Sequence, residues 1–163
     1  MLAVLTMGLV FCDAGDHTPE EGAKDPPSHA ISHTDAIREF ISLHQHLREL
    51  SEDRDLSALS QIVTHDSPLI RTATHDIRQL IADKVIDRSS FTTKQVDVTS
   101  ASRSEIAITQ VVVIEPRFIH ERTGEPLKTS HALRQEVEWI LRYESGEWKV
   151  HDALVISSKE IHQ

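Results

Sequence analysis

The spacing of apolar residues along the chain changes once, near residue 91. Before that point, apolar positions recur every three or four residues, as on the buried face of an amphipathic helix. After it, apolar and polar residues alternate, as in strands with one buried face. The pattern therefore predicts a group of helices followed by an antiparallel sheet in one domain.

Three helices are predicted ahead of residue 91. The first begins near Ser32 or Thr34, because either side chain can cap a helix. Its apolar stripe consists of Ala36, Phe40, Leu43, Leu47 and Leu50, widened by Ile37, Ile41 and His44. A shorter helix is expected over residues 56–63. The third begins with Ser67 and Pro68, a cap followed by a first-turn proline, and is expected to include Val85.

Four long strands are expected after the helices, over residues 91–99, 105–120, 128–143 and 147–158. Pro116 is expected to mark a bend or bulge, since proline cannot donate to a sheet. No clear strand is expected between the second and third helices. Strands of this length must twist and bend, which predicts a curved sheet with the helices in its hollow.

Two turns set a register for this sheet. A turn at Ser145-Gly146 gives the pairs Tyr143–Trp148, Leu141–Val150, Trp139–Asp152 and Val137–Leu154. A turn at Thr123-Gly124 gives the pairs Ile114–Leu133, Val112–Gln135, Gln110–Val137, Ile108–Trp139 and Ile106–Leu141. Both turns place the same apolar set on one face, as a sheet with one buried face requires.

The final hairpin, "RYESGEWKVHDALVIS", carries a resemblance to a known superfamily. The order of helices then meander, with this ending, resembles the nuclear transport factor 2-like (NTF2-like, also cystatin-like or SnoaL-like) superfamily over residues 34–158. The matching residues are Tyr143, Gly146, Trp148, His151, Asp152 and Ser157. The resemblance implies an α+β cone: N-terminal helices packed in the hollow of a strongly curved antiparallel sheet of four or more strands.

Asp152 is the main candidate for chemistry. The register places it on the inner face with Trp139 and Ile108, near Gln110 and Gln135, while His131 lies toward the rim. A buried carboxylate must be hydrogen-bonded, paired, protonated or open to a wet cavity, so it is either a structural acceptor or part of a pocket. The resemblance implies that Asp152 could be a general base. Such chemistry also needs a second group, and His131 is the other catalytic candidate.

No metal site or cofactor is expected. His44 and His46 are two residues apart on a helix and therefore point in different directions, whereas a chelating helical pair is three or four apart. The repeated "THD" at 64–66 and 74–76 has no recognised ligand spacing.

The opposite face of the sheet is mixed, with an apolar stripe between charged residues. This stripe consists of Val111, Val113, Ile140, Ala153 and Val155. An exposed stripe of this kind is usually covered by a partner. It therefore predicts a homo-oligomer or docking to another protein.

Composition separates an N-terminal region from the domain. The run "MLAVLTMGLVFC" predicts a signal-like leader over residues 1–14, with Cys12 as an acylation candidate although Phe11 is unfavourable there. Residues 15–31 are rich in Pro, Gly and charge and predict a disordered tether, which leaves residues 32–160 for the domain. The net charge of -9 without a basic cluster argues against a nucleic-acid partner.

These observations favour an exported, non-enzymatic binding or assembly module that docks through its sheet. Periplasmic, cell-surface and secreted locations are all open, with membrane contact only through an N-terminal anchor. The alternatives are an isomerase or lyase with Asp152 as general base, and a carrier of a small hydrophobic ligand.

Overall fold

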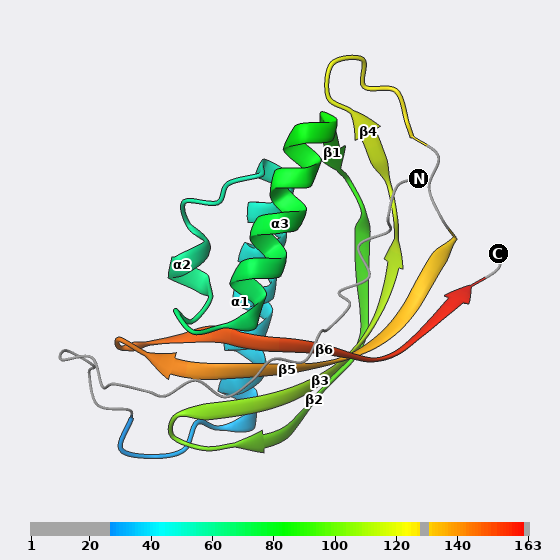
Figure 1. Ribbon diagram of the computed structural model, residues 1–163. Helices are drawn as coiled ribbons and strands as arrows, with labels where there is room; N and C mark the ends of the chain where they lie inside the picture. The colour runs from blue at the N-terminus through cyan, green and yellow to red at the C-terminus, as the bar shows by residue number, and fades with distance from the viewer. Residues whose placement is uncertain (1–26, 128–130, 162–163) are drawn as a thin grey trace.

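A four-stranded antiparallel sheet curves around three helices in the computed structural model, which describes residues 27–127 and 131–161. The helices are α1 (His33–Asp53), α2 (Leu59–Ile62) and α3 (Pro68–Asp83). The strands are β1 (Val85–Asp87), β2 (Ser90–Ala101), β3 (Glu105–Glu115), β4 (Phe118–His120), β5 (Ala132–Glu144) and β6 (Glu147–Ile161). Figure 1 shows the helices in the hollow of the bent sheet β2-β3-β5-β6. The predicted α+β class and helix-in-hollow arrangement are confirmed.

The first helix begins where the sequence predicted. The Ser32 hydroxyl accepts a hydrogen bond from the Asp35 backbone N–H at 3.2 Å and so caps α1. Its buried residues belong to the predicted stripe, namely Ala36, Phe40, Leu43 and Leu50. Arg54, in a left-handed conformation, ends the helix, and its N–H bonds back to the last turn. The helix therefore presents one apolar face to the inner face of the sheet, which is the face toward the helices.

The third helix ends earlier than predicted. Ser67 caps α3 as expected, but Lys84 adopts a left-handed conformation (φ 56°) and turns the chain away after Asp83. Val85 then starts β1 and pairs with His120 of β4 instead of continuing the helix. Burial explains this end, because Val85 packs with Leu80 and Phe118 in a small second core.

The connection before α3 is more extended than predicted. The helix expected over residues 56–63 is reduced to α2, and Val63 instead forms an isolated parallel bridge with Val150 of β6. The Thr64 N–H donates to the Val150 carbonyl at 3.0 Å. An isolated β-bridge therefore lies between the second and third helices, where no strand was expected.

The long strand predicted over residues 105–120 divides at Pro116. Strand β3 ends at Glu115, and β4 resumes at Phe118 to pair with β1 in a separate two-stranded sheet. The bend predicted at Pro116 is confirmed. Beyond β4, Gly124 adopts φ 69° and its N–H donates to the His120 carbonyl, which places a turn at Thr123-Gly124 as expected. Residues 128–130, predicted to begin the next strand, lie outside the described residues.

The structure confirms the register predicted between β3 and β5, but only part of the one predicted between β5 and β6. All five pairs predicted between β3 and β5 are confirmed, including Ile108 with Trp139 and Gln110 with Val137. The turn at Ser145-Gly146, with φ 55° and 96°, also gives the expected pairs at the start of β6, down to Leu141 with Val150. Beyond that pair the prediction is wrong, because β6 contains a bulge.

The bulge inserts one extra residue, His151, between two successive pairs of the hairpin. Asp152 then lies opposite Ile140, and Ala153 takes the place opposite Trp139. A one-residue insertion moves the following side chains to the other face, here as far as the second register shift between Val155 and Ser157. Asp152 and Leu154 therefore belong to the outer face, the face away from the helices, while Ala153 and Val155 turn inward.

Contacts from the loop between α2 and α3 hold the bulge in place. The His151 carbonyl accepts a hydrogen bond from the Ser67 hydroxyl, and its Nδ1 lies 2.9 Å from Thr64 Oγ1. The Asp152 carboxylate accepts the Ala153 backbone N–H at 2.8 Å. These bonds satisfy polar groups that a bulge removes from the regular ladder.

Candidate functional site

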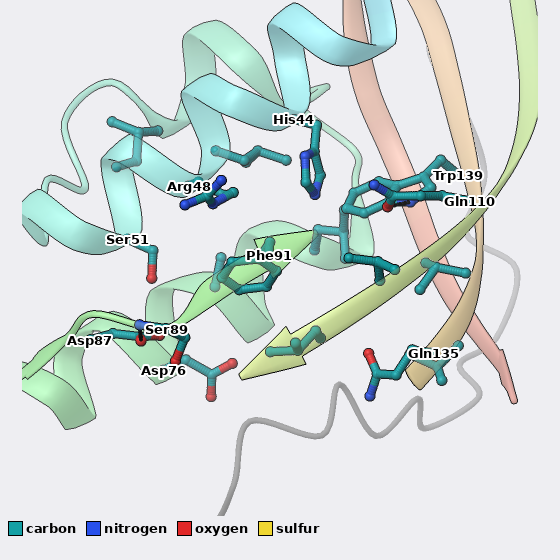
Figure 2. A pocket seen from close by; sticks show the side chains of 18 of the residues that line it. His44, Arg48, Ser51, Asp76, Asp87, Ser89, Phe91, Gln110, Gln135 and Trp139 are labelled. Atoms are coloured by element: carbon teal, nitrogen blue, oxygen red, sulfur yellow. Dashed lines mark hydrogen bonds between the residues drawn. The ribbon is translucent and has the colours of Figure 1, made fainter. Parts of the chain in front are cut away.

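A cavity of about 210 Å³ lies between the helices and the inner face of the sheet. Its wall is largely apolar, with Leu47, Leu59, Leu69, Ile77, Phe91, Val112, Val137 and Val155 among the lining residues. In Figure 2, Gln110 and Trp139 lie on the strand side of the cavity, while His44 and Arg48 project from the helix side. The sheet curves around the helices, and the helix side chains fill only part of the hollow. A cavity therefore remains between the helices and the sheet.

The sheet side of the cavity is closed by a chain of hydrogen bonds. Trp139 Nε1 donates to Gln110 Oε1 at 3.1 Å, and Gln110 Nε2 donates to Thr93 Oγ1 at 2.8 Å. Gln135, another lining residue, donates through Nε2 to Ser158 Oγ at 3.3 Å. Since the single indole N–H donates to Gln110, Trp139 holds the shape of the wall without offering a proton to a ligand.

Three of the five predicted pocket residues line this cavity: Gln110, Gln135 and Trp139. Ile108 is fully buried in the hydrophobic core rather than on the cavity wall. The placement of Asp152 in the pocket is wrong, because the bulge moves it to the outer face opposite Ile140. His131 is exposed and does not line the cavity.

His44 lies on the helix side of the cavity among aromatic rings. Its ring centroid is 5.3 Å from that of Trp139 and 5.5 Å from that of Phe40, and the ring of Phe91 is 6.4 Å away. Burial, together with the positive charge of Arg48, lowers the pKa of His44 from 6.5 to about 4. The imidazole is therefore neutral at pH 7 and acts as part of the cavity wall.

Arg48 follows His44 one helical turn later. Its guanidinium carbon is 4.7 Å from the centroid of the Phe91 ring, and Nη2 bonds to Glu52 Oε1 at 3.2 Å. Within the described part of the chain, its Nε is the single buried side-chain nitrogen or oxygen that lacks a hydrogen-bond partner. An unsatisfied buried donor costs on the order of 1–3 kcal/mol.

Asp76 is the second charged residue of the wall, contributed by α3. Among the described residues its carboxylate has no hydrogen-bond or ion-pair partner, and burial raises its pKa despite the opposing effect of His75. Nearby in the lining, Asp87 accepts a hydrogen bond from the Ser89 N–H at 2.8 Å. The cavity therefore combines a large apolar surface with a few polar groups.

Sequence reasoning did not predict Arg48, Asp76 or His44 as cavity residues: His44 was considered in the helix stripe and as a metal ligand, and Asp76 within the repeated "THD". A signal was present, because Phe40, His44 and Arg48 are spaced four apart and share one face of α1. Likewise, Ala73, Asp76, Ile77 and Leu80 follow the helical spacing of α3. A charged residue within an apolar stripe indicates a polar group directed at a cavity.

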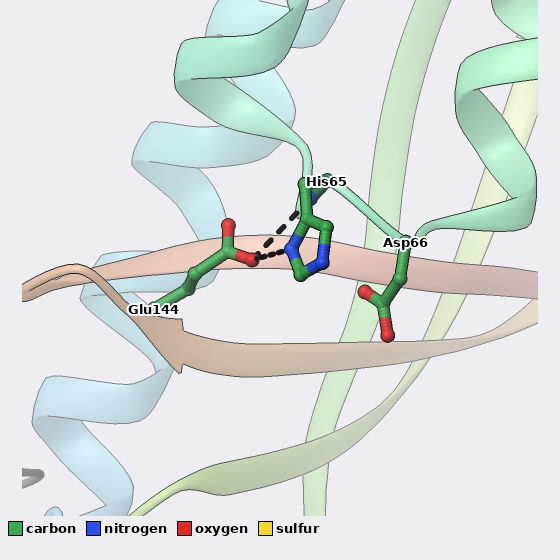
Figure 3. A group of neighbouring side chains, drawn as sticks. All are labelled: His65, Asp66 and Glu144. Carbon is green, nitrogen blue, oxygen red and sulfur yellow. Dashed lines mark hydrogen bonds and ion pairs between the residues drawn. The ribbon is translucent and has the colours of Figure 1, made fainter. Parts of the chain in front are cut away.

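A group of three potential metal ligands lies outside the cavity, where the α2–α3 loop meets the last hairpin. His65, Asp66 and Glu144 bring their ligand atoms within 4.8 Å of one another, and His65 Nδ1 contacts Glu144 Oε1 (Figure 3). Lys149 Nζ is 3.3 Å from Glu144 and Arg142 is 3.7 Å from Asp66. Because these cations already compensate the carboxylates, we interpret the group as an ion-pair cluster that joins the loop to the hairpin.

The outer face carries part of the stripe that the sequence predicted. Val111, Val113 and Ile140 lie on it and are partly exposed, but Ala153 and Val155 turn to the inner face, where Val155 lines the cavity. Leu154 and Ile156 are the strongly exposed apolar residues of β6, at 42% and 53%. In the described ranges, no helix is both long and apolar enough to cross a membrane.

Comparisons with known proteins bear on the fold alone. No family model and no curated protein matches the chain. Among solved structures, it is similar to the intermembrane space region of the chloroplast protein ARC6, with a TM-score of 0.56 and 11% identity over 78% of this chain and 98% of that one. An engineered protein named Rd1NTF2_05 aligns with a TM-score of 0.43 and 16% identity, over 75% of this chain and 97% of that one.

Proposed function

We propose that this protein is a non-enzymatic binding module that takes a small, largely apolar ligand into the cavity of the cone. The observation that carries the proposal is the cavity of about 210 Å³, closed by the Gln110–Trp139 pair and walled by apolar side chains. Ligand sites of this class are concave and mostly apolar with a few placed polar groups. An apolar cavity of roughly 150 Å³ can hold benzene, so this one suits a substituted single ring or a short branched chain.

The non-enzymatic part of the proposal rests on the positions of the titratable groups. The expected general base, Asp152, lies on the outer face and cannot reach a ligand in the cavity. Gln110 and Gln135 exchange no proton at neutral pH, and the His44 imidazole is enclosed by aromatic rings. These features support binding over isomerase or lyase chemistry with Asp152 as general base.

Filling the cavity tests the proposal. In Ala73→Leu, a larger side chain enters the lining from α3, so the affinity for ethylbenzene should fall at least tenfold. For the wild type, ethylbenzene at ten times its Kd should raise the free energy of unfolding by about 1.4 kcal/mol. Chemical denaturation with and without ethylbenzene measures both effects.

Ala82→Leu is the matched control, because Ala82 is an exposed residue of the same helix. Its affinity for ethylbenzene should equal that of the wild type. Absence of saturable binding to the wild type, or equal loss in both variants, would contradict a ligand site in the cone.

Self-association through the outer face is a second candidate, favoured by the exposure of Leu154 and Ile156. If a second copy of the chain covers this face, Val111→Lys combined with Leu154→Glu should convert a dimer to a monomer with little change in melting temperature. Sedimentation equilibrium measures the mass. Val155→Glu is the contrasting variant, since it places a carboxylate in the cavity wall and should lower the melting temperature. A monomeric wild type at tens of micromolar would rule this candidate out.

Export, with or without an acyl chain on Cys12, stays part of the proposal. The leader of residues 1–14 and the tether up to residue 26 lie outside the described residues.

A further inference from the structure

We propose that the ligand of the cavity carries a hydrogen-bond donor, an N–H or O–H group, which binds the side-chain oxygen of Gln135. This inference rests on the proposed function, since it assigns chemistry to a ligand of the same cavity. It predicts a preference for donors among ligands of nearly equal size and shape. That preference can fail while binding itself stands.

Gln135 brings an amide group into the apolar wall from β5. It pairs with Val112 of β3 on the inner face of the sheet, and both residues line the cavity. The amide nitrogen is held in place, because Nε2 donates to Ser158 Oγ at 3.3 Å. Gln135 is 5% exposed, so its Oε1 has little access to bulk water.

The Oε1 atom of Gln135 has no hydrogen-bond partner among the described residues, although a donor can reach it. Arg48 Nε is the single side-chain nitrogen or oxygen in those ranges that is both shut off from solvent and without a partner. Since Gln135 Oε1 also has no partner, it is not shut off. Figure 2 shows this oxygen on the side toward Phe91 and Gln110, with the amide nitrogen directed away from them. A ligand in the cavity therefore meets an accessible acceptor.

The polar groups of the sheet wall are engaged with one another and leave this oxygen to the ligand. Trp139 Nε1 donates to Gln110, and Gln110 Nε2 donates to Thr93. Within the described part of the chain, no group donates to Gln135 Oε1. An apolar ligand that covers the oxygen would remove its water and leave it unsatisfied, whereas a ligand N–H or O–H replaces the lost bond.

Three probes of nearly equal size and shape test the inference: ethylbenzene, N-methylaniline and anisole. In each, the atom between the benzene ring and the methyl group differs: a carbon, an N–H donor or an ether oxygen. We expect N-methylaniline to bind about tenfold more tightly than the other two, because it alone donates to Gln135 Oε1. The indole N–H resonance of Trp139 reports binding in an NMR titration of the full chain, and a Trp148→Phe variant assigns it.

The side-chain carbonyl carbon of Gln135 gives a direct reading in the unaltered protein. A hydrogen bond to Oε1 should move this carbon resonance downfield when N-methylaniline binds, and the other two probes should move it less. A shift of the same sign and size with all three probes would overturn the contact with Oε1.

Two variants separate the oxygen from general effects on the sheet. Gln135→Leu keeps an apolar side chain in the wall but removes the acceptor, so N-methylaniline should fall to the affinity of ethylbenzene. Gln95 is an exposed glutamine of β2, and Gln95→Leu should keep the full preference. If Gln135→Leu does not fold, the carbon shift of the wild type decides by itself.

The outcomes are distinguishable. Equal binding of ethylbenzene and N-methylaniline to the wild type would overturn the donor while leaving the cavity as a ligand site. Tightest binding of anisole would show that the wall presents an N–H instead, and would overturn the inference. A preference for N-methylaniline that survives in Gln135→Leu would overturn the assignment to Gln135. Failure of all three probes to bind would overturn the proposed function itself.

Discussion

Replacing Ala153 with Asp should cost about 4 kcal/mol or more of the free energy of unfolding, whereas replacing Asp152 with Ala should cost about 1 kcal/mol or less. Ala153 is 1% exposed and faces Trp139, so a carboxylate there would be buried without a partner. Asp152 lies on the outer face and would lose one hydrogen bond, to the Ala153 N–H. Urea denaturation of both variants measures the difference.

Ala107→Asp serves as the matched control for Ala153→Asp. Ala107 lies on the outer face of β3 opposite Ile140, in the same row of the sheet as Asp152. A carboxylate there stays in contact with water, so the cost should be about 1 kcal/mol, mainly from the poor strand propensity of Asp. Tolerance of Asp at 153, together with a severe loss on removal of Asp152, would instead support an uninterrupted hairpin in which Asp152 faces inward.

This pair of residues marks the limit of register prediction from sequence. All five predicted β3–β5 pairs are correct, because apolar residues alternate without interruption on both strands and only one register buries them together. The bulge in β6 depends on Thr64 and Ser67, more than 80 residues away in the chain, which bond to His151. Local alternation carries no information about such a contact.

The same reasoning explains which cavity residues were foreseen. Gln110, Gln135 and Trp139 follow from strand alternation, which assigns each side chain to a face. Helical spacing assigns a side chain to a face less sharply than strand alternation does, because the buried stripe of a helix is wide. In addition, Arg48 can direct either its apolar stem or its charged group inward. Its contact with Phe91 depends on how α1 lies against β2, a relation that helical spacing alone does not define.

The early end of α3 has a similar origin. Val85 continues the helical spacing, and the sequence offers no glycine or proline to stop the helix there. Its pairing with His120 and its packing against Phe118 come from a strand more than 30 residues later. Tertiary burial therefore overrides a helix pattern whose local signals are favourable.

Lowering the pH from 7 to 4.5 should remove about 2 kcal/mol of the free energy of unfolding through His44 alone. Burial among aromatic rings, with Arg48 nearby, lowers the folded-state pKa of His44 to about 4, whereas its ordinary pKa of 6.5 applies to the unfolded chain. Between these values the unfolded chain binds more protons than the folded one. The stabilising contribution is therefore complete above pH 6.5, is lost as the pH falls toward 4, and changes no further below that.

A His44→Leu variant isolates this contribution, because leucine fills a similar space without titrating. Carboxylates also destabilise the fold in acid, so the informative quantity is the difference between variant and wild type at each pH. The variant should lose about 2 kcal/mol less than the wild type between pH 7 and 4.5, as measured by urea denaturation. His46→Leu, which removes an exposed histidine of the same helix, should follow the wild type. Parallel pH curves for the wild type and His44→Leu would show that water reaches the imidazole, and that His44 does not form part of a dry cavity wall.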